Sequence, residues 1–289
     1  MTLNFPAILT KIVCLLSLLF LHPCKAEKHS KDSLLFQLSQ AEGEQKISIQ
    51  NQLSAIYADD SVQLSLKYAH KAYDLSVRLN NVAQKGQALY NMAKAYYKMG
   101  ELQKSFSLFH KSLEIKQQSA QDRYLPNLLN NLGVIYKRWG NYEKAIEYYN
   151  RSLASMDDGN NKKMFATTLN NIGIVYEDWG NYEKALEYYN KSLEIYQQIN
   201  DKAGIARAYN NMGLVYHFKG IYDKAIQYHR KSMRIKEEIG DKTGVANSIN
   251  NIGFVYYEAW NENEKALDYY FKSLNIYKEL ENKRGLAIS

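Results

Sequence analysis

The heptapeptide Asn130-Asn131-Leu132-Gly133-Val134-Ile135-Tyr136 follows a pattern that occurs four times in this chain of 289 residues: two asparagines, an apolar residue, glycine, two apolar residues and tyrosine. Its other copies stand at 170–176, 210–216 and 250–256, and a looser copy, Tyr-Asn-Met-Ala-Lys-Ala-Tyr, occupies 90–96. Consecutive copies are 40 residues apart. A period of this length predicts a supersecondary unit that buries its apolar face against its neighbours, and therefore one elongated array.

The unit at 166–200 predicts a pair of helices. Leu169, Ile172, Gly173 and Tyr176 form the apolar stripe of an amphipathic helix. A glycine at 180 is expected to end that helix, and the asparagine after it to cap the next one. Small residues at 173 and 185 allow two antiparallel helices to approach closely, while tyrosines fill the spaces between them.

This pattern of small, aromatic and apolar positions resembles the tetratricopeptide repeat (TPR) family. In one unit it is carried by Leu169, Ile172, Gly173, Tyr176, Gly180, Tyr182, Ala185, Tyr189 and Ser192. The family's usual repeat has about 34 residues, whereas the period here is 40. The longer form resembles the repeats of kinesin light chains, G-protein-signalling modulators and bacterial sensor proteins. The resemblance implies an all-α solenoid, a right-handed superhelix of antiparallel helix hairpins.

Six repeats are predicted, with boundaries at 48–85 (degenerate, with serine at the central glycine position), 86–125, 126–165, 166–205, 206–245 and 246–285. Residues 27–47 are expected to form an N-terminal capping segment, and 286–289 the start of a truncated seventh repeat. The sequence at 282–289 resembles the turn and helix start at 241–248. From this we expect the chain to be a fragment of a longer polypeptide.

The N-terminus predicts export. An apolar run at 12–21 follows Lys11, and Cys24 and Ala26 stand at the small-residue positions of a cleavage site after residue 26. Residues 1–26 are therefore expected to be a signal peptide, and the chain to be periplasmic or otherwise extracytoplasmic. An alternative is an uncleaved or lipid anchor, with Cys24 as the lipidated residue. Both cysteines of the chain lie in this segment, so no disulfide or cysteine metal site is expected in the mature chain.

The sequence contains no recognisable catalytic motif. It has no glycine-rich phosphate loop, no H-E-x-x-H and no G-x-S-x-G. His217 and His229 share one repeat, but His229 stands where tyrosines 149 and 189 stand in other repeats, so we interpret it as a core residue. The net charge of +7 is spread over alternating patches, with no basic stripe for nucleic acid. We expect no enzyme activity, cofactor, metal or nucleic-acid partner.

The repeated asparagines are the main candidates for partner binding. In the family, the first helix of each repeat lines the concave groove, and one lining position lies two residues before the central small residue. That position is occupied by Asn91, Asn131, Asn171, Asn211 and Asn251. An amide offers a donor and an acceptor to a peptide backbone. Alternatively, the asparagines join neighbouring helices and fix the angle of stacking.

Specificity is expected from groove positions that differ between repeats. The candidates are Arg138, Asp178, Arg207, His217 and Tyr257. Their alternating charge favours a peptide or protein partner. The predicted function is an exported, non-catalytic interaction scaffold. The alternative is the extracytoplasmic input region of a bacterial sensor histidine kinase, in which a membrane segment would follow the C-terminal end of this chain.

Overall fold

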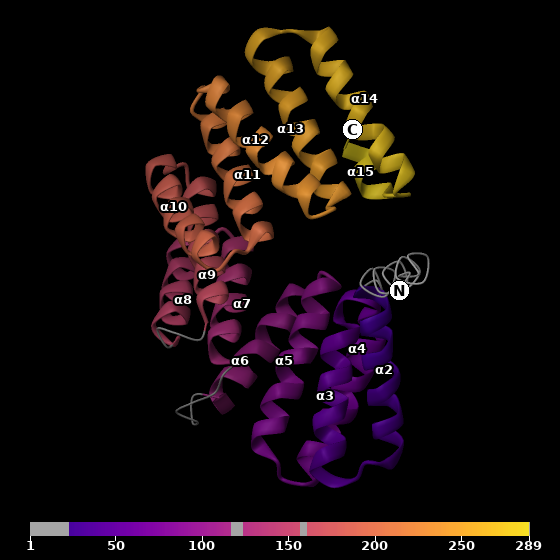
Figure 1. Cartoon of the computed structure of the whole chain (residues 1–289). Helices are drawn as coiled ribbons and strands as arrows, with labels where there is room; N and C mark the ends of the chain where they lie inside the picture. Colours follow the sequence, from indigo (N-terminus) through magenta and orange to yellow (C-terminus); the bar gives the residue numbers. More distant parts are fainter. Residues whose placement is uncertain (1–22, 117–123, 157–160, 289) are drawn as a thin grey trace, which may run out of the picture. The chain divides into compact units, whose positions relative to one another are not determined.

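A computed structural model of the chain describes residues 23–116, 124–156 and 161–288. Every regular element in these ranges is an α-helix, and successive helices form antiparallel hairpins (Figure 1). The predicted all-α solenoid of helix hairpins is therefore confirmed. The chain divides into two compact units, 1–122 and 123–289. Unit 1 contains helices α2 to α6, and unit 2 contains α7 to α15.

Unit 1 begins with a helix that covers the first hairpin. Its helices are α2 (Pro23–Gln40), α3 (Gly43–Asp60), α4 (Val62–Arg78), α5 (Val82–Lys98) and α6 (Leu102–Lys116). Helices α3 and α4 form repeat 1, α5 and α6 form repeat 2, and α4 packs against α5. Leu34, Leu35 and Leu38 of α2 pack on the buried Leu53 of α3. Helix α2 therefore caps the apolar face of repeat 1.

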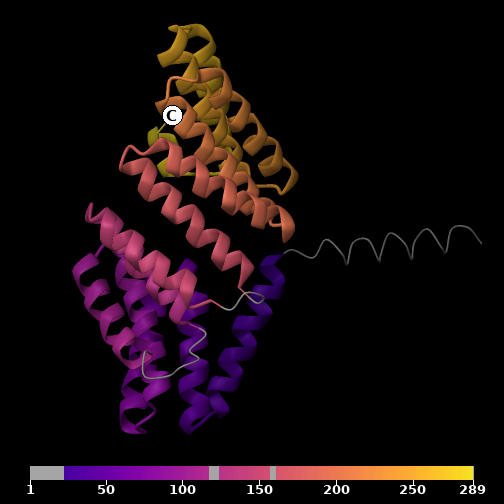
Figure 2. The same cartoon turned by 90° about the vertical axis from the view of Figure 1, so that its left-hand side faces the viewer.

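Unit 2 contains four further hairpins and a short final helix (Figure 2). Repeat 3 is α7 (Leu125–Arg138) with α8 (Tyr142–Ala154), and repeat 4 is α9 (Lys162–Asp178) with α10 (Tyr182–Gln198). Repeat 5 is α11 (Lys202–Phe218) with α12 (Tyr222–Glu238), and repeat 6 is α13 (Lys242–Trp260) with α14 (Asn263–Glu279). Helix α15 (Lys283–Ile288) follows and packs on α14.

The first helix of most repeats begins before the boundary expected from the sequence. The boundaries at 86, 166, 206 and 246 fall four residues inside α5, α9, α11 and α13, whereas that at 126 lies one residue inside α7. The cause is the N-cap. The side chain of Asp201 accepts a hydrogen bond from the backbone N–H of Gly204, and that of Asp241 from the N–H of Gly244. An aspartate in this position starts a helix at the next residue.

In repeats 3, 4 and 5 the hairpin is closed by a ring placed over the central glycine. Gly133 lies under the ring of Tyr149, and Gly173 under that of Tyr189, so closely that a methyl group on either glycine would overlap the ring. Gly213 lies in the same way under the imidazole of His229. Burial lowers the pKa of His229 to about 3, with a smaller contribution from Lys236. The interpretation of His229 as a core residue is confirmed.

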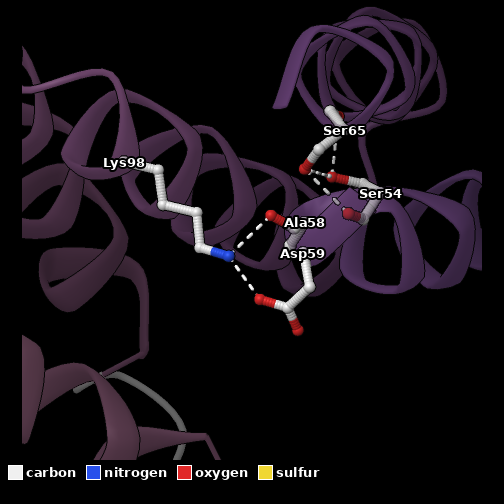
Figure 3. Close-up of polar contacts among 5 residues, drawn as sticks. All are labelled: Ser54, Ala58, Asp59, Ser65 and Lys98. Atoms are coloured by element: carbon white, nitrogen blue, oxygen red, sulfur yellow. Dashed lines mark hydrogen bonds and ion pairs between the residues drawn. The ribbon is translucent and has the colours of Figure 1, made fainter. Parts of the chain in front are cut away.

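Serine hydroxyls join the two helices of a hairpin. The hydroxyl of Ser152 donates to the carbonyl of Pro126 at 2.7 Å, and that of Ser232 to the carbonyl of Ala206 at 2.8 Å. In repeat 1, Ser54 and Ser65 each donate to the other's backbone carbonyl, at 2.8 and 2.7 Å (Figure 3). The bond to the carbonyl of residue 54 also occurs in repeat 2, where Ser105 donates to the carbonyl of Ala93, so the hydroxyl of Ser54 adds one donation that the other repeats lack.

The turn of repeat 6 differs from those of the other repeats. Gly180 of repeat 4 adopts a φ of 79°, in the left-handed region that favours glycine. In repeat 6 the one extra residue lets α13 extend to Trp260, and Asn261 takes the left-handed conformation with a φ of 53°. Asparagine tolerates this region better than other side chains do, so the turn closes without glycine.

The expected signal peptide lies mostly outside the described residues. Of residues 1–26, the structure describes 23–26, which form the beginning of α2. Among the helices that it describes, none has the length and hydrophobicity needed to cross a membrane.

Candidate functional site

Asparagine side chains connect the first helices of consecutive repeats. In unit 2 the amide nitrogen of Asn171 donates to the side-chain oxygen of Asn130 at 3.0 Å. Asn211 donates to Asn170 at 3.1 Å, and Asn251 donates to Asn210 at 3.2 Å. In each bond, the second asparagine of one heptapeptide donates to the first asparagine of the preceding one. We call this series the asparagine ladder.

Unit 1 contains the same bond in a variant form. Asn91 donates to the backbone oxygen of Asn51 at 3.0 Å and to its side-chain oxygen at 3.3 Å. The amide of Asn51 in turn donates to the side-chain oxygen of Gln84 at 2.9 Å. Asn91 is buried. Asn51 stands three residues before Ser54, the central position of repeat 1, so this bond joins the same two positions as the bonds of the asparagine ladder in unit 2.

These contacts show that Asn91, Asn171, Asn211 and Asn251 lie at junctions between repeats. Asn171, Asn211 and Asn251 are half-buried, and their amide nitrogens donate to the preceding first helix. Asn131 is also half-buried. In the structure the other four asparagines thus join neighbouring helices, which is the alternative that the sequence left open. Contact of the same asparagines with a partner remains a prediction.

Ion pairs join the carboxyl ends of the same helices. Lys137 of repeat 3 pairs with Asp178 of repeat 4 at 2.9 Å, and His217 of repeat 5 approaches Glu258 of repeat 6 at 2.9 Å. In unit 1, the ammonium of Lys98 donates to the carbonyl of Ala58 at 2.7 Å and pairs with Asp59 (Figure 3). This cation lowers the pKa of Asp59 through a hydrogen bond and charge attraction.

The five predicted specificity residues differ in exposure. Arg138, Asp178 and Arg207 are exposed, and the ring of Tyr257 is 54% exposed. His217 is 7% exposed, and its ring lies among those of phenylalanines 218 and 254 and tyrosine 222. The structure therefore brings Arg138, Asp178, Arg207 and Tyr257 to the surface of the first helices and places His217 beneath it.

A buried carboxyl group lies beside this row of ion pairs. Glu177 accepts a hydrogen bond from the hydroxyl of Tyr189 at 2.5 Å. Burial raises the pKa of Glu177 to about 7, because desolvation penalises the charged form more strongly than the tyrosine hydrogen bond and the charge of Lys137 favour it. Asp178 raises the pKa further. The charge state of Glu177 therefore changes near neutral pH.

Sequence reasoning missed one polar cavity. A space of about 290 Å³ between α11, α12 and α13 is lined by Arg207, Asn210, Lys236 and Asn247, among others. Lys236 occupies a position at which repeats 4 and 6 carry tyrosine, at 196 and 277. That break in the repeat pattern is the sequence signal that could have identified it. No cluster of three or more histidine, cysteine or acidic side chains placed to hold a metal occurs among the described residues.

Comparison with known families identifies the chain as a TPR protein. One family model described as tetratricopeptide repeat matches residues 84–158 and 204–279, and a second model of the same description matches 166–198. The matches cover more than half of the chain, so it belongs to the tetratricopeptide repeat family. A search of curated protein sequences gave no significant match.

Solved structures of similar fold span most of the chain. BtubC (BKLC) from P. vanneervenii is 23% identical, with 77% of this chain and 93% of that chain covered and a TM-score of 0.64. The apo form of RapI is 20% identical, with 89% and 91% covered and a TM-score of 0.65. A Rap protein complexed with competence and sporulation factor is 16% identical, with 89% and 76% covered and a TM-score of 0.65. At these identities the similarity establishes the fold alone.

The raised pKa of Glu177 predicts a pH dependence of stability. Its pKa is about 7 in the folded chain, against an ordinary value of 4.5 for a glutamate carboxyl. The folded state therefore binds the proton more tightly, and the contribution of Glu177 to stability is complete below pH 4.5 and is lost as the pH rises through 7. The change corresponds to about 3 kcal/mol. Urea unfolding at several pH values should show Glu177→Gln gaining that amount over the parent between pH 4.5 and 7.5.

The control is Glu194→Gln, which removes one carboxylate from the exposed face of α10. Its difference from the parent should not vary with pH over that window. If Glu177→Gln and Glu194→Gln gave the same pH profile, the buried-carboxyl assignment would be rejected.

Proposed function

We propose that the chain is an exported, non-catalytic scaffold that binds an extended peptide or a partner domain in the groove lined by its first helices. The main support for this proposal is the difference in solvent exposure between recurring and non-recurring side chains on the first helices of unit 2. The recurring asparagines are engaged within the fold, as the asparagine ladder shows, whereas four side chains that do not recur, those of Arg138, Asp178, Arg207 and Tyr257, are exposed. A partner would meet the non-recurring ones.

The exposed side chains have the chemistry of a protein interface. Phe218 is 55% exposed and Tyr257 54% exposed, and Phe254 is also exposed on the same series of first helices. Aromatic and arginine side chains are typical anchors of protein interfaces. Arg138 and Arg207 with Asp178 add charges of both signs. The Rap protein solved with competence and sporulation factor supports such a role for this fold.

Photo-cross-linking tests where a partner binds. Benzoylphenylalanine placed at Tyr257 on α13 should give cross-linked products with proteins of a periplasmic extract. The same group placed at Phe271, an exposed ring on the second helix α14, should give none. Once a product is identified, Tyr257→Ala should weaken its binding about tenfold or more, since anchor rings contribute on that scale. Products from position 271 alone would contradict groove binding.

Export is tested separately. The apolar run at 12–21 and the small residues at 24 and 26 support cleavage after Ala26. Mass spectrometry of protein from the periplasm of a Gram-negative host should show a chain that begins at Glu27, and Cys24→Ser should leave that mass unchanged. A chain that begins at Cys24 and carries the mass of lipid would establish the anchored alternative. Retention of residues 1–26 in the cytoplasm would reject export.

A further inference from the structure

One pair of positions bridges the two helices of a repeat at the end near the next turn. It consists of the residue six before the central small residue and a residue on the second helix. In repeat 4 the pair is Thr167 and Tyr196, whose hydroxyls are 3.0 Å apart. In repeat 6 the hydroxyl of Tyr277 donates to the side-chain oxygen of Asn247 at 2.6 Å. In each pair the two side chains therefore form a hydrogen bond with each other.

Repeat 2 makes the same contact with a lysine. The buried Lys116 of α6 approaches the side-chain oxygen of Gln87 on α5, at 3.5 Å. A lysine at the second-helix position is thus compatible with the fold when the first-helix position supplies an acceptor.

Repeat 5 breaks this rule because both positions carry positive charge. The first-helix position is Arg207 and the second-helix position is Lys236, and neither side chain has an acceptor for the other. The ammonium of Lys236 donates instead to Ser248 at 3.0 Å. Burial lowers the pKa of Lys236, and nearby Asp241 offsets this in part.

The exchange of tyrosine for lysine also coincides with open space. Tyr196 packs its ring on Gly204, and Tyr277 packs its ring on Gly285. At Gly244, the equivalent glycine, the nearest side-chain atoms are not those of a ring but the carboxylate of Asp241 and the thin aliphatic stem of Lys236. The cavity of about 290 Å³ lies at this point. A space of this size is large enough for a carboxylate or phosphate group together with water.

The other polar groups of the cavity leave mainly donors for a ligand. The side-chain oxygen of Asn210 already accepts from Asn251, and that of Asn247 already accepts from Tyr277, so their amide nitrogens remain as donors. The nearby acids are engaged. Asp241, which lines the cavity, accepts from the N–H of Gly244 at 2.8 Å. Asp201, which interacts electrostatically with Arg207, pairs with Lys163 at 3.0 Å.

We propose that this cavity is an oxyanion-binding pocket, in which a carboxylate or phosphoryl group bridges Lys236 and Arg207 and accepts hydrogen bonds from Asn210 and Asn247. The bridging anion takes the place of the direct contact made in repeats 2, 4 and 6. Charge-assisted hydrogen bonds to two cations are among the stronger polar contacts in proteins. The pocket would hold an acidic group of the partner that binds in the groove. This source of the anion rests on the proposed function, whereas anion binding by the pocket does not.

The test uses two small anions and the side-chain signal of Lys236. The chain is labelled with ¹³C-lysine, and the Lys236 signal is identified by its loss in Lys236→Tyr. Sodium acetate or sodium phosphate is added at constant ionic strength, set with sodium chloride. The expected result is a saturable shift of the Lys236 signal, with a rise in its titration midpoint. Saturation by acetate alone assigns the pocket to carboxylates, and saturation by phosphate alone assigns it to phosphoryl groups.

Two variants copy pairs that the fold already contains. Arg207→Gln creates the lysine–glutamine pair of repeat 2, and Lys236→Tyr restores the ring of repeats 4 and 6. Arg207→Gln should weaken anion binding at least tenfold. The control Arg230→Gln removes one positive charge from the exposed face of α12 and should leave the affinity unchanged.

The proposal is overturned if the Lys236 signal shifts with neither anion, or if Arg207→Gln binds as tightly as the parent. Because the anions are added without a partner, this outcome is independent of the cross-linking at Tyr257. Anion binding without cross-linking rejects the groove proposal alone, and cross-linking without anion binding rejects the pocket alone.

Discussion

The hydrogen bond between asparagines of consecutive first helices is the contact on which the array depends. Asn211 donates to Asn170, and the same bond recurs one repeat on either side. Asn170 is 1% exposed, so its amide would incur a desolvation cost if the next repeat did not supply the donor. Apolar packing tolerates sliding of one helix along another, whereas a buried amide pair is satisfied at one register. The ladder therefore fixes how repeats 4, 5 and 6 are each placed on the repeat before, and the bond from Asn91 to Asn51 does the same for repeat 2.

Once the asparagine ladder fixes the register, other contacts hold each repeat together. In repeats 3, 4 and 5 a ring closes the hairpin over the central glycine, as Tyr189 does over Gly173, and in repeats 3 and 5 a serine hydroxyl joins the two helices. At the carboxyl ends, Lys137 with Asp178 and His217 with Glu258 continue the connection between repeats. All of these contacts are made between residues of the chain itself. Tyr257 and Arg138 do not recur between the repeats of unit 2 and are exposed, which is why the proposed function places recognition there.

The fold could be predicted from the sequence because its causes are local and repeated. The spacing of Gly173, Gly180 and Asn181 indicates a helix, a turn and a cap, and the structure confirms all three. The role of the asparagines could not be decided in this way. A position two residues before Gly173 lies at the border between the helix junction and the exposed face, and the helical period alone does not tell which one its amide contacts. The packing of the preceding helix decides it.

The cavity beside Lys236 and the state of Glu177 depend on contacts that no motif contains. Lys236 differs from Tyr196 and Tyr277 in a way that is visible in the sequence, but its effect depends on which residue stands 29 positions earlier on the facing helix. Glu177 reads as a groove acid, and its pKa near 7 follows from burial beside Tyr189. Such properties become accessible once the helices are packed.

A double-mutant cycle on Asn170 and Asn211 tests the central claim most directly. The free energy of unfolding is measured for the parent, Asn170→Ala, Asn211→Ala and the double variant, with Asn170 and Asn251 as a pair that share no hydrogen bond. We predict a coupling energy of about 0.5–1.5 kcal/mol for Asn170 with Asn211. We predict additivity within about 0.5 kcal/mol for the control pair. Additive effects for Asn170 and Asn211 would show that the ladder does not hold the repeats together.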